Sequence, residues 1–271
     1  MRRKDNSSYS APENIARALL LVLASTVLSA CQSFSNNETT YPYTYNENII
    51  KAENPQRVVI AHTNLGSPSR QYLEPYASKI DAIVKARLEQ GNFQVVSNRE
   101  FQSEWRAAVR RHGASYNEQT GHINQRALEA ILADSLAAVQ KKDLADAVIF
   151  TDIIERDVIF VGRGKRTANW DGVSRQVKLR GGGGQLSADF DWSQRTKAAS
   201  LLVIAYSASG EHIFKGAGGL DVTREIDPRS GTGRFVRKRS QFGAKHFIEE
   251  AVNIALHPLV VMENYVMHEK P

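Results

Sequence analysis

The sequence predicts an α/β protein, in an α+β arrangement where helices flank a single mixed β-sheet and a long β-hairpin or loop is inserted. Two patterns predict this class: helical periods and short apolar runs alternate in the first half of the chain, and strand patterns dominate the second half. The chain has 271 residues, of which 42% are hydrophobic, which is enough apolar material for a sizeable core. We therefore expect one folded domain over residues 56–258.

The domain begins with an apolar run at 57–62, which predicts a buried first strand. Apolar residues at helical spacing then predict a helix over 73–90, in which Pro75 is tolerated because it falls in the first turn. A second strand is expected at 93–96. These three elements predict a strand-helix-strand unit.

Two further helices are predicted from their N-terminal caps. Ser97 and Glu100 have the spacing of a capping box, and the helix that follows should turn Phe101 and Trp105 into the core. Asn124 is expected to cap the next helix.

The second half of the domain is predicted to form strands, with a hairpin turn at Ser209-Gly210 and a last helix over 242–256 that buries Phe247. The strands are expected at 147–154 with a continuation at 158–161, at 199–207, at 211–215 and at 220–223.

Residues 1–31 have the organisation of a bacterial lipoprotein signal. A basic segment precedes an apolar stretch at 18–28, which is 11 residues long and therefore too short to span a bilayer. The tetrapeptide Leu28-Ser29-Ala30-Cys31 resembles a lipobox, which implies cleavage before Cys31 and covalent acylation of that residue. The alternative is an ordinary buried cysteine after a removable secretory signal. Since this cysteine is the single one in the chain, an intramolecular disulfide and a Cys-rich zinc site are excluded.

The residue after Cys31 is Gln32 rather than Asp, and in bacterial lipoproteins this implies sorting to the outer membrane, facing the periplasm. The polar segment 31–55 is predicted to be an acylated, flexible tether, and 259–271 a C-terminal tail. Within the tether, alternating tyrosines at Tyr41, Tyr43 and Tyr45 favour either an edge strand or a strap across a neighbouring subunit, with a disordered tail as the alternative.

The chain without residues 1–30 has 31 basic and 27 acidic residues, and the excess is concentrated in two segments. Residues 156–197 hold nine Lys and Arg against four Asp, and residues 224–245 hold seven against two. Such segments suit anionic partners, although runs of charge are also commonly just solvated. Because the signal directs the chain out of the cytoplasm, nucleic acid is not expected as a partner.

Together, the acylated Cys31, the polar tether, the strand that starts at Arg57 and the hairpin sequence AASLLVIAYSASGEHIFKGAG over 198–218 resemble the curli-secretion lipoprotein superfamily. This group includes curli export channels, exopolysaccharide-export ring lipoproteins and lipoprotein activators of penicillin-binding proteins. Its members share an α/β domain similar to the N-terminal domain of the translocation protein TolB. The resemblance covers residues 56–257 and implies the same type of fold here.

The basic insertion at 156–197 contains two amphipathic runs, 173–179 and 185–192, around four glycines at 181–184. Export channels of the resembling family build a membrane pore from such hairpins. Each run here has only 7–8 residues, against about 9–11 for a spanning strand, so a periplasmic hairpin or loop is the main expectation and a membrane-inserted one the alternative.

Aromatic and arginine side chains in the two basic segments are predicted to contact partners or other copies of the chain, since such residues are enriched at protein interfaces. The predicted contact residues are Trp170, Arg175, Phe190, Trp192, Arg234 and Arg237.

The sequence does not predict an enzyme. The segment 162–167 resembles a phosphate-binding loop only superficially, because Ile159 stands where that loop needs Gly and Arg166 where it needs a hydroxyl. No metal site and no cofactor are expected beyond the acyl groups on Cys31; Asp189 and Asp191 suggest a weak Ca²⁺ site or, more simply, a solvated strand face.

The resulting hypothesis is a homo-oligomeric scaffold in secretion or surface-polymer export. It would be anchored in the outer membrane and would contact an envelope protein or an anionic polymer. A monomeric lipoprotein regulator of a peptidoglycan synthase is the alternative, and a hydrolase is a third class.

Overall fold

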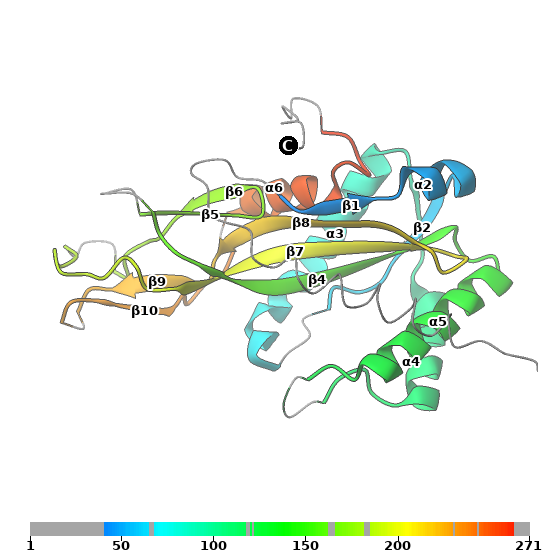
Figure 1. The fold of residues 1–271 in the computed structure, drawn as a ribbon, viewed down its shortest axis with the longest axis horizontal. Coiled ribbons are helices and arrows are strands. Elements are labelled where there is room, and N and C mark those ends of the chain that lie inside the picture. The colour runs from blue at the N-terminus through cyan, green and yellow to red at the C-terminus, as the bar shows by residue number, and fades with distance from the viewer. Residues whose placement is uncertain are drawn as a thin grey trace, which may run out of the picture. The chain divides into compact units, whose positions relative to one another are not determined.

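A six-stranded mixed sheet lies at the centre of the computed structural model (Figure 1), with its strands in the order β1-β8-β7-β4-β2-β3. The residues that the structure describes are 41–64, 68–117, 120, 122–161, 166–181, 185–229, 231–242 and 244–262. They belong to one unit, Thr39–Pro271. Helices flank the sheet, so the α+β class is confirmed.

The parallel part of the sheet comes from the first half of the domain. β2 (Arg57–Ile60) pairs in parallel with β3 (Gln94–Val96) on one side and with β4 (Ala147–Val158) on the other. All three strands start within one residue of their expected positions, because each has an apolar run at or next to its start; β4 then continues past the expected end at 154 through polar residues to Val158.

The antiparallel part is built from long strands. β4 pairs with β7 (Thr196–Ser207) over its whole length, and β7 pairs with β8 (His212–Val222) across the predicted Ser209-Gly210 hairpin. The predicted strand at 220–223 is not a separate edge strand, because Val222 pairs with Ala198 at the end of β8.

Helices cover both faces of the sheet. Val58 and Ile60 point to the face that packs on α3 (Ala77–Gln90) and α6 (Lys245–Leu256). Val59, which points the other way, packs on the side of α4 (Arg99–His112) and α5 (Gln125–Lys141). This alternation follows from the two-residue period of a strand, and it explains why the three residues of β2 after Arg57 are all apolar.

The helix boundaries agree only partly with the predicted caps. The Asn124 side chain accepts a hydrogen bond from the Ala127 backbone N–H at 3.3 Å, as predicted for α5. The capping box at Ser97 and Glu100 is wrong: the Ser97 hydroxyl accepts from the Arg99 N–H at 3.4 Å, one residue too early for the box. A 3-10 helix, Pro68–Tyr76, precedes α3 and contains Pro75, so the α-helix itself begins later than expected.

Part of the predicted tether is folded. β1 (Tyr43–Tyr45) pairs antiparallel with β8 at the edge of the sheet, and α2 (Glu47–Glu53) follows directly. The edge-strand interpretation of the tyrosines is therefore correct within this chain. The reason is an available partner: β8 presents one open side to which any extended segment with suitable side chains can pair.

The end of the sheet that carries the basic segments has its own apolar cluster, which we call the distal cluster: Val158, Phe160, Ala168, Trp170, Val173, Val177, Phe190, Ala198, Val222, Ile226 and Ile254. Two hairpins surround it. One joins β5 (Thr167–Trp170) to β6 (Val173–Gln176), and the other joins β9 (Arg224–Asp227) to β10 (Arg234–Arg237).

The insertion contains a hairpin at a position that was not predicted. The chain turns at Asp171-Gly172, where both residues have positive φ (40° and 82°); of the predicted glycine turn at 181–184, residues 182–184 lie outside the described residues. An Asp-Gly pair with left-handed backbone matches the twist of a two-residue hairpin turn. The described part of the expected second run, 185–192, contains no strand.

Candidate functional site

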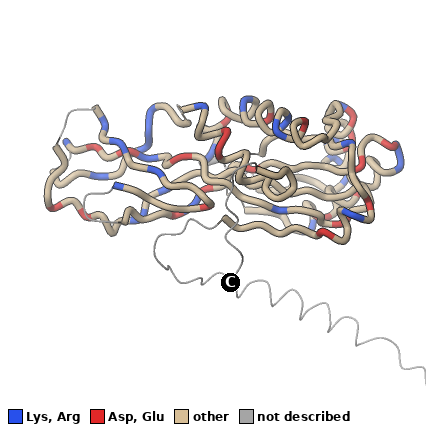
Figure 2. The backbone as a smooth tube through the Cα atoms, turned by 90° about the horizontal axis from the view of Figure 1, so that it is seen from above, with Lys and Arg blue, Asp and Glu red and all other residues tan. Residues whose placement is uncertain are grey.

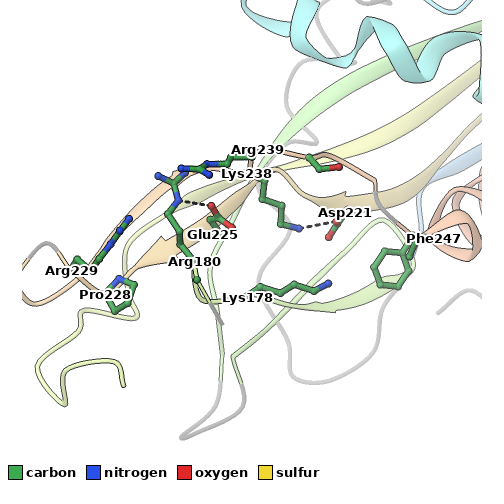
Figure 3. Close-up of a pocket in the computed structure, with 12 residues that line it drawn as sticks. Lys178, Arg180, Asp221, Glu225, Pro228, Arg229, Lys238, Arg239 and Phe247 are labelled. Atoms are coloured by element: carbon green, nitrogen blue, oxygen red, sulfur yellow. Dashed lines mark hydrogen bonds and ion pairs between the residues drawn. The ribbon is translucent and has the colours of Figure 1, made fainter. Parts of the chain in front are cut away.

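A basic groove of about 850 Å³ lies at the end of the sheet that carries β9 and β10 (Figure 3). Three segments that are distant in sequence form it: the stretch after β6, the end of β8 with β9, and the connection from β10 to α6. Its lining residues are Lys178, Arg180, Gly181, Asp221, Glu225, Pro228, Arg229, Lys238, Arg239, Ser240, Ala244 and Phe247.

The groove lining carries five basic and two acidic side chains, and both carboxylates are paired inside it. Arg180 Nε lies 2.6 Å from Glu225 Oε1, and Lys238 Nζ lies 2.8 Å from Asp221 Oδ2. The side chains of the second pair are each only 9% exposed, so this pair forms the floor of the groove. The lining therefore keeps a surplus of positive charge after these pairs are formed. Figure 2 shows Lys and Arg positions on several neighbouring segments at this end of the unit.

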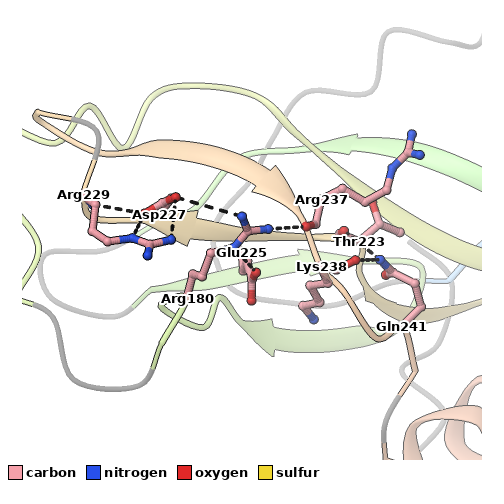
Figure 4. Close-up of polar contacts among 8 residues, drawn as sticks. All are labelled: Arg180, Thr223, Glu225, Asp227, Arg229, Arg237, Lys238 and Gln241. Carbon is pink, nitrogen blue, oxygen red and sulfur yellow. Dashed lines mark hydrogen bonds and ion pairs between the residues drawn. The ribbon is translucent and has the colours of Figure 1, made fainter.

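Backbone hydrogen bonds hold the stretch after β6 against β9. The Arg180 N–H donates to Ile226 O at 2.8 Å, and the Ile226 N–H donates to Lys178 O at 3.0 Å. The Arg180 guanidinium also donates through Nη2 to Arg237 O at 2.8 Å, which ties this stretch to β10 (Figure 4). One arginine thus fixes the relative position of two walls of the groove.

A buried glutamine fixes the third wall. Gln241 is 3% exposed, and its Nε2 donates to Thr223 O at 3.2 Å and to Lys238 O at 3.0 Å (Figure 4). Its backbone N–H donates to the Tyr76 hydroxyl at 3.0 Å. The loop that carries Lys238 and Arg239 is therefore anchored, so these side chains start from a defined backbone.

At the outer end of the groove, Arg229 and Asp227 form a pair within one turn. Arg229 Nε donates to Asp227 Oδ1 at 3.1 Å and Nη2 to Oδ2 at 3.3 Å (Figure 4). These hydrogen bonds lower the pKa of Asp227, and the same contact raises the pKa of Arg229. Both groups of this pair therefore stay charged over the physiological range of pH.

The predicted contact residues are mostly inside the protein. Trp170, Arg175 and Phe190 are at most 8% exposed, so contacts within the chain already cover the side chains that were predicted to contact a partner. Trp192 is half-buried on the distal cluster, and only Arg234 and Arg237 are exposed. The six predicted contact residues have polar neighbours in the sequence, but tertiary contacts cover three of them, Trp170, Arg175 and Phe190.

Specific partners accompany the burial of the two polar side chains among these three, Trp170 and Arg175. Trp170 Nε1 donates to Ser200 Oγ at 3.1 Å. Arg175 Nε donates to Leu220 O at 3.0 Å, its Nη2 lies 2.8 Å from Glu250 Oε2, and its guanidinium stacks over the Phe247 ring at 4.0 Å. Phe247, which was expected in the core, is consequently only half-buried and lines the groove.

None of the six predicted contact residues lines the groove. The sequence signal that did point to it was the surplus of Lys and Arg at 156–197 and 224–245, because Lys178 and Arg180 come from the first segment and Lys238 and Arg239 from the second. What the sequence could not provide was that these segments meet.

The predicted lipidation site and cleavage motif, Leu28, Ser29, Ala30 and Cys31, lie outside the described residues, as do the glycines 182–184. In the part of the chain that the structure describes, no helix is both long and apolar enough to cross a membrane. The carboxylates of Asp189 and Asp191 are exposed, and no group of three metal-binding side chains occurs in the described ranges.

A smaller hollow of about 470 Å³ lies at the carboxyl ends of β2 and β3, with Asp81, Lys85 and Asn98 among its lining residues. Asp81 is fixed there: its Oδ1 accepts from the Thr63 hydroxyl at 2.5 Å, and its Oδ2 lies 2.8 Å from His62 Nδ1. Through these contacts, the Asp81 carboxylate joins α3 to the loop after β2. This arrangement is consistent with a structural role.

Comparison with protein-family models gives no match, and neither does comparison with curated proteins.

Proposed function

We propose that the protein is a lipoprotein of the outer membrane, anchored through Cys31, whose periplasmic domain acts by binding an anionic partner in the basic groove. In this proposal it is a non-enzymatic assembly subunit in secretion or surface-polymer export. The observation that carries the proposal is the groove itself, with five basic side chains held on three anchored segments.

The state of the groove carboxylates supports binding over catalysis. A general acid or base needs a carboxylate or imidazole that is free to exchange a proton with substrate. Glu225 and Asp221 are each within 2.8 Å of a basic nitrogen, so using either one would first require breaking an ion pair. The same pairs leave the other basic groups oriented by a rigid frame, as an anion-binding surface requires.

The length of the tether supports a partner at the membrane that holds the anchor. Because β1 begins at Tyr43, only the 11 residues 32–42 separate Cys31 from the first strand. An extended chain of that length reaches about 40 Å, whereas the predicted tether of 25 residues would reach about 85 Å. The shorter reach disfavours the alternative of a regulator that extends far from its own membrane.

Two experiments test the anchor and the binding separately. Cys31→Ser should abolish incorporation of radiolabelled palmitate, and unchanged labelling would refute the anchor. The lipidated protein in a neutral detergent should bind dextran sulfate, used as a generic polyanion. The double variant Lys178→Gln/Arg239→Gln should bind it at least tenfold more weakly, whereas equal binding by this variant would refute the groove as the binding surface.

Mass photometry of the lipidated protein extracted in detergent tests the assembly part. A homo-oligomer of defined size is expected for a scaffold. A strictly monomeric species across micromolar concentrations would favour the regulator.

A further inference from the structure

Two basic side chains in the groove are available for a ligand. Lys178 and Arg239 are exposed, and neither has an acidic partner within hydrogen-bonding distance among the described residues. In Figure 3, Lys178 and Arg239 lie on different sides of the Lys238–Asp221 pair, and their side chains extend in opposite directions. An ammonium and a guanidinium group in one groove offer separate contacts to an anion with several oxygens, because the arginine fork can bind two oxygens at once.

The start of α6 adds to the positive potential of this surface. Ala244, which lines the groove, is the N-cap residue of this 12-residue helix. The helix has no side-chain cap at this end and no acidic residue in its first turn, so its dipole is not offset by the protein itself. The helix end alone would not define a site, but here its N-cap residue lines the same groove as Lys178 and Arg239.

The position of Tyr41 shows where the chain from Cys31 enters the folded unit. The first described residue, Tyr41, packs on the distal cluster, and Tyr41 Cβ would lie 3.2 Å from a Cβ added to Gly172. The same cluster contains Val177 and Ile226, which are the neighbours of the groove residues Lys178 and Glu225 in the chain. The chain that leads to Cys31 therefore leaves the folded unit from this cluster. Its exit lies at the C-terminal end of α6, where the Tyr41 hydroxyl is 2.5 Å from His257 Nδ1, and the groove lies at the N-terminal end of the same helix, at Ala244.

We propose that the basic groove binds the phosphate headgroup of an anionic lipid in the membrane that holds the Cys31 anchor. This inference rests on the proposed function, because the anchor provides the proximity. The tether holds the start of the folded unit within about 40 Å of the bilayer surface, so the groove stays close enough for a headgroup to have a high effective concentration there. The phosphate oxygens are bound by Arg239 and Lys178, while the Lys238–Asp221 pair keeps the floor polar and uncharged overall.

The direct test is binding of two probes to the lipidated protein in a neutral detergent: dihexanoyl phosphatidylglycerol and inorganic phosphate. Isothermal titration should show saturable binding of the lipid. Lys178→Gln and Arg239→Gln should each weaken it about fivefold, since one basic group near a membrane surface contributes roughly that factor. Arg106→Gln and Arg110→Gln, which remove exposed arginines from α4 on the other side of the sheet, should leave it unchanged.

A second measurement places the contact in a bilayer. In nanodiscs made of equal parts phosphatidylcholine and phosphatidylglycerol, hydrogen exchange should slow for peptides covering 176–181 and 237–247 relative to nanodiscs of phosphatidylcholine alone. Equal exchange in both kinds of nanodisc would overturn the inference. Equal weakening by the α4 variants would also overturn it, because it would indicate nonspecific charge attraction.

Inorganic phosphate and the lipid together show whether the groove binds a free anion or a lipid headgroup. Dextran sulfate shows whether the groove binds anions at all. If inorganic phosphate binds as tightly as the lipid, the groove is a site for a free anion and the headgroup assignment fails. If dextran sulfate binds in the groove but the lipid does not, the headgroup inference fails while the proposed function stands. If neither binds, both fail.

Discussion

The Lys238–Asp221 pair at the floor of the groove should contribute several kcal/mol to the free energy of unfolding, and only while both charged side chains are present. The two charged atoms are 2.8 Å apart and both side chains are 9% exposed. At an effective dielectric constant of about 20, their attraction is about 6 kcal/mol. Lys238→Met removes this attraction and leaves the Asp221 carboxylate buried without a counter-ion. We expect a loss of about 3–5 kcal/mol in the free energy of unfolding, because part of the attraction only offsets desolvation.

The assay is urea unfolding followed by tryptophan fluorescence, with thermal unfolding as a check. A loss of that size corresponds to a decrease of about 10 °C in Tm for a domain of this length. The double variant Lys238→Met/Asp221→Asn should recover at least half of the loss. Asparagine removes the unpaired charge but still accepts the hydrogen bond that Asp221 Oδ1 receives from the Val222 N–H at 2.7 Å.

The control is Lys215→Met, which removes an exposed lysine from β8, the strand that carries Asp221. It should change the free energy of unfolding by less than about 0.5 kcal/mol. Two results would refute the reasoning. One is a Lys238→Met variant within 1 kcal/mol of the unmodified protein. The other is a double variant whose loss equals the sum of the two single losses, which would mean that the residues are not coupled.

Three further predictions concern the core and the dependence on pH. Gly218→Ala should lower the free energy of unfolding by at least about 2 kcal/mol, because the added Cβ would clash with the Ala251 carbonyl oxygen of α6; Ser174→Ala, on the exposed face of β6, should have little effect in the same urea assay. Burial, and to a lesser extent the nearby Arg87, lowers the pKa of His257 below its usual 6.5. The unfolded chain therefore binds more protons just below that pH, so stability should fall as the pH falls from 7 to 5; His257→Gln should flatten this slope, and an unchanged slope would contradict the assignment. Burial raises the pKa of Asp152. Its contribution has the opposite sign, since stability is lost as the pH rises through the folded-state value. Asp152→Asn should accordingly increase the free energy of unfolding at pH 7 but not at pH 3.5, and an equal change at both values would show that ionisation is not the cause.

A groove that binds any anionic partner and a groove that binds a lipid headgroup need different properties. The first requires only that anions bind where Lys178 and Arg239 lie. The second requires that the bound anion be the headgroup of a lipid, which the short tether would bring close. A role in assembly is compatible with both, because a subunit held against its membrane has fewer orientations in which to meet another copy.

Local sequence determined the elements whose stabilising contacts lie within a few residues. The apolar run after Arg57, the Asn124 cap and the Ser209-Gly210 hairpin depend on a two-residue period, one side-chain hydrogen bond and one tight turn, and all three are present. The Asp-Gly pair at 171–172 is also a local turn signal, although the turn of the insertion was predicted at the glycine run 181–184 instead. Composition likewise located the two basic segments, because net charge is a property of the segment itself.

Burial was decided only by the tertiary structure. Arg175 has polar neighbours in sequence, yet it is 5% exposed because Leu220 and Glu250, 45 and 75 residues away, accept its hydrogen bonds and its charge. The groove depends in the same way on the hydrogen bonds that join Lys178 to Ile226 and Gln241 to Thr223. The exposure of a side chain depends on which distant segments cover it. For this reason the sequence could identify the charges of the site but not the surface on which they meet.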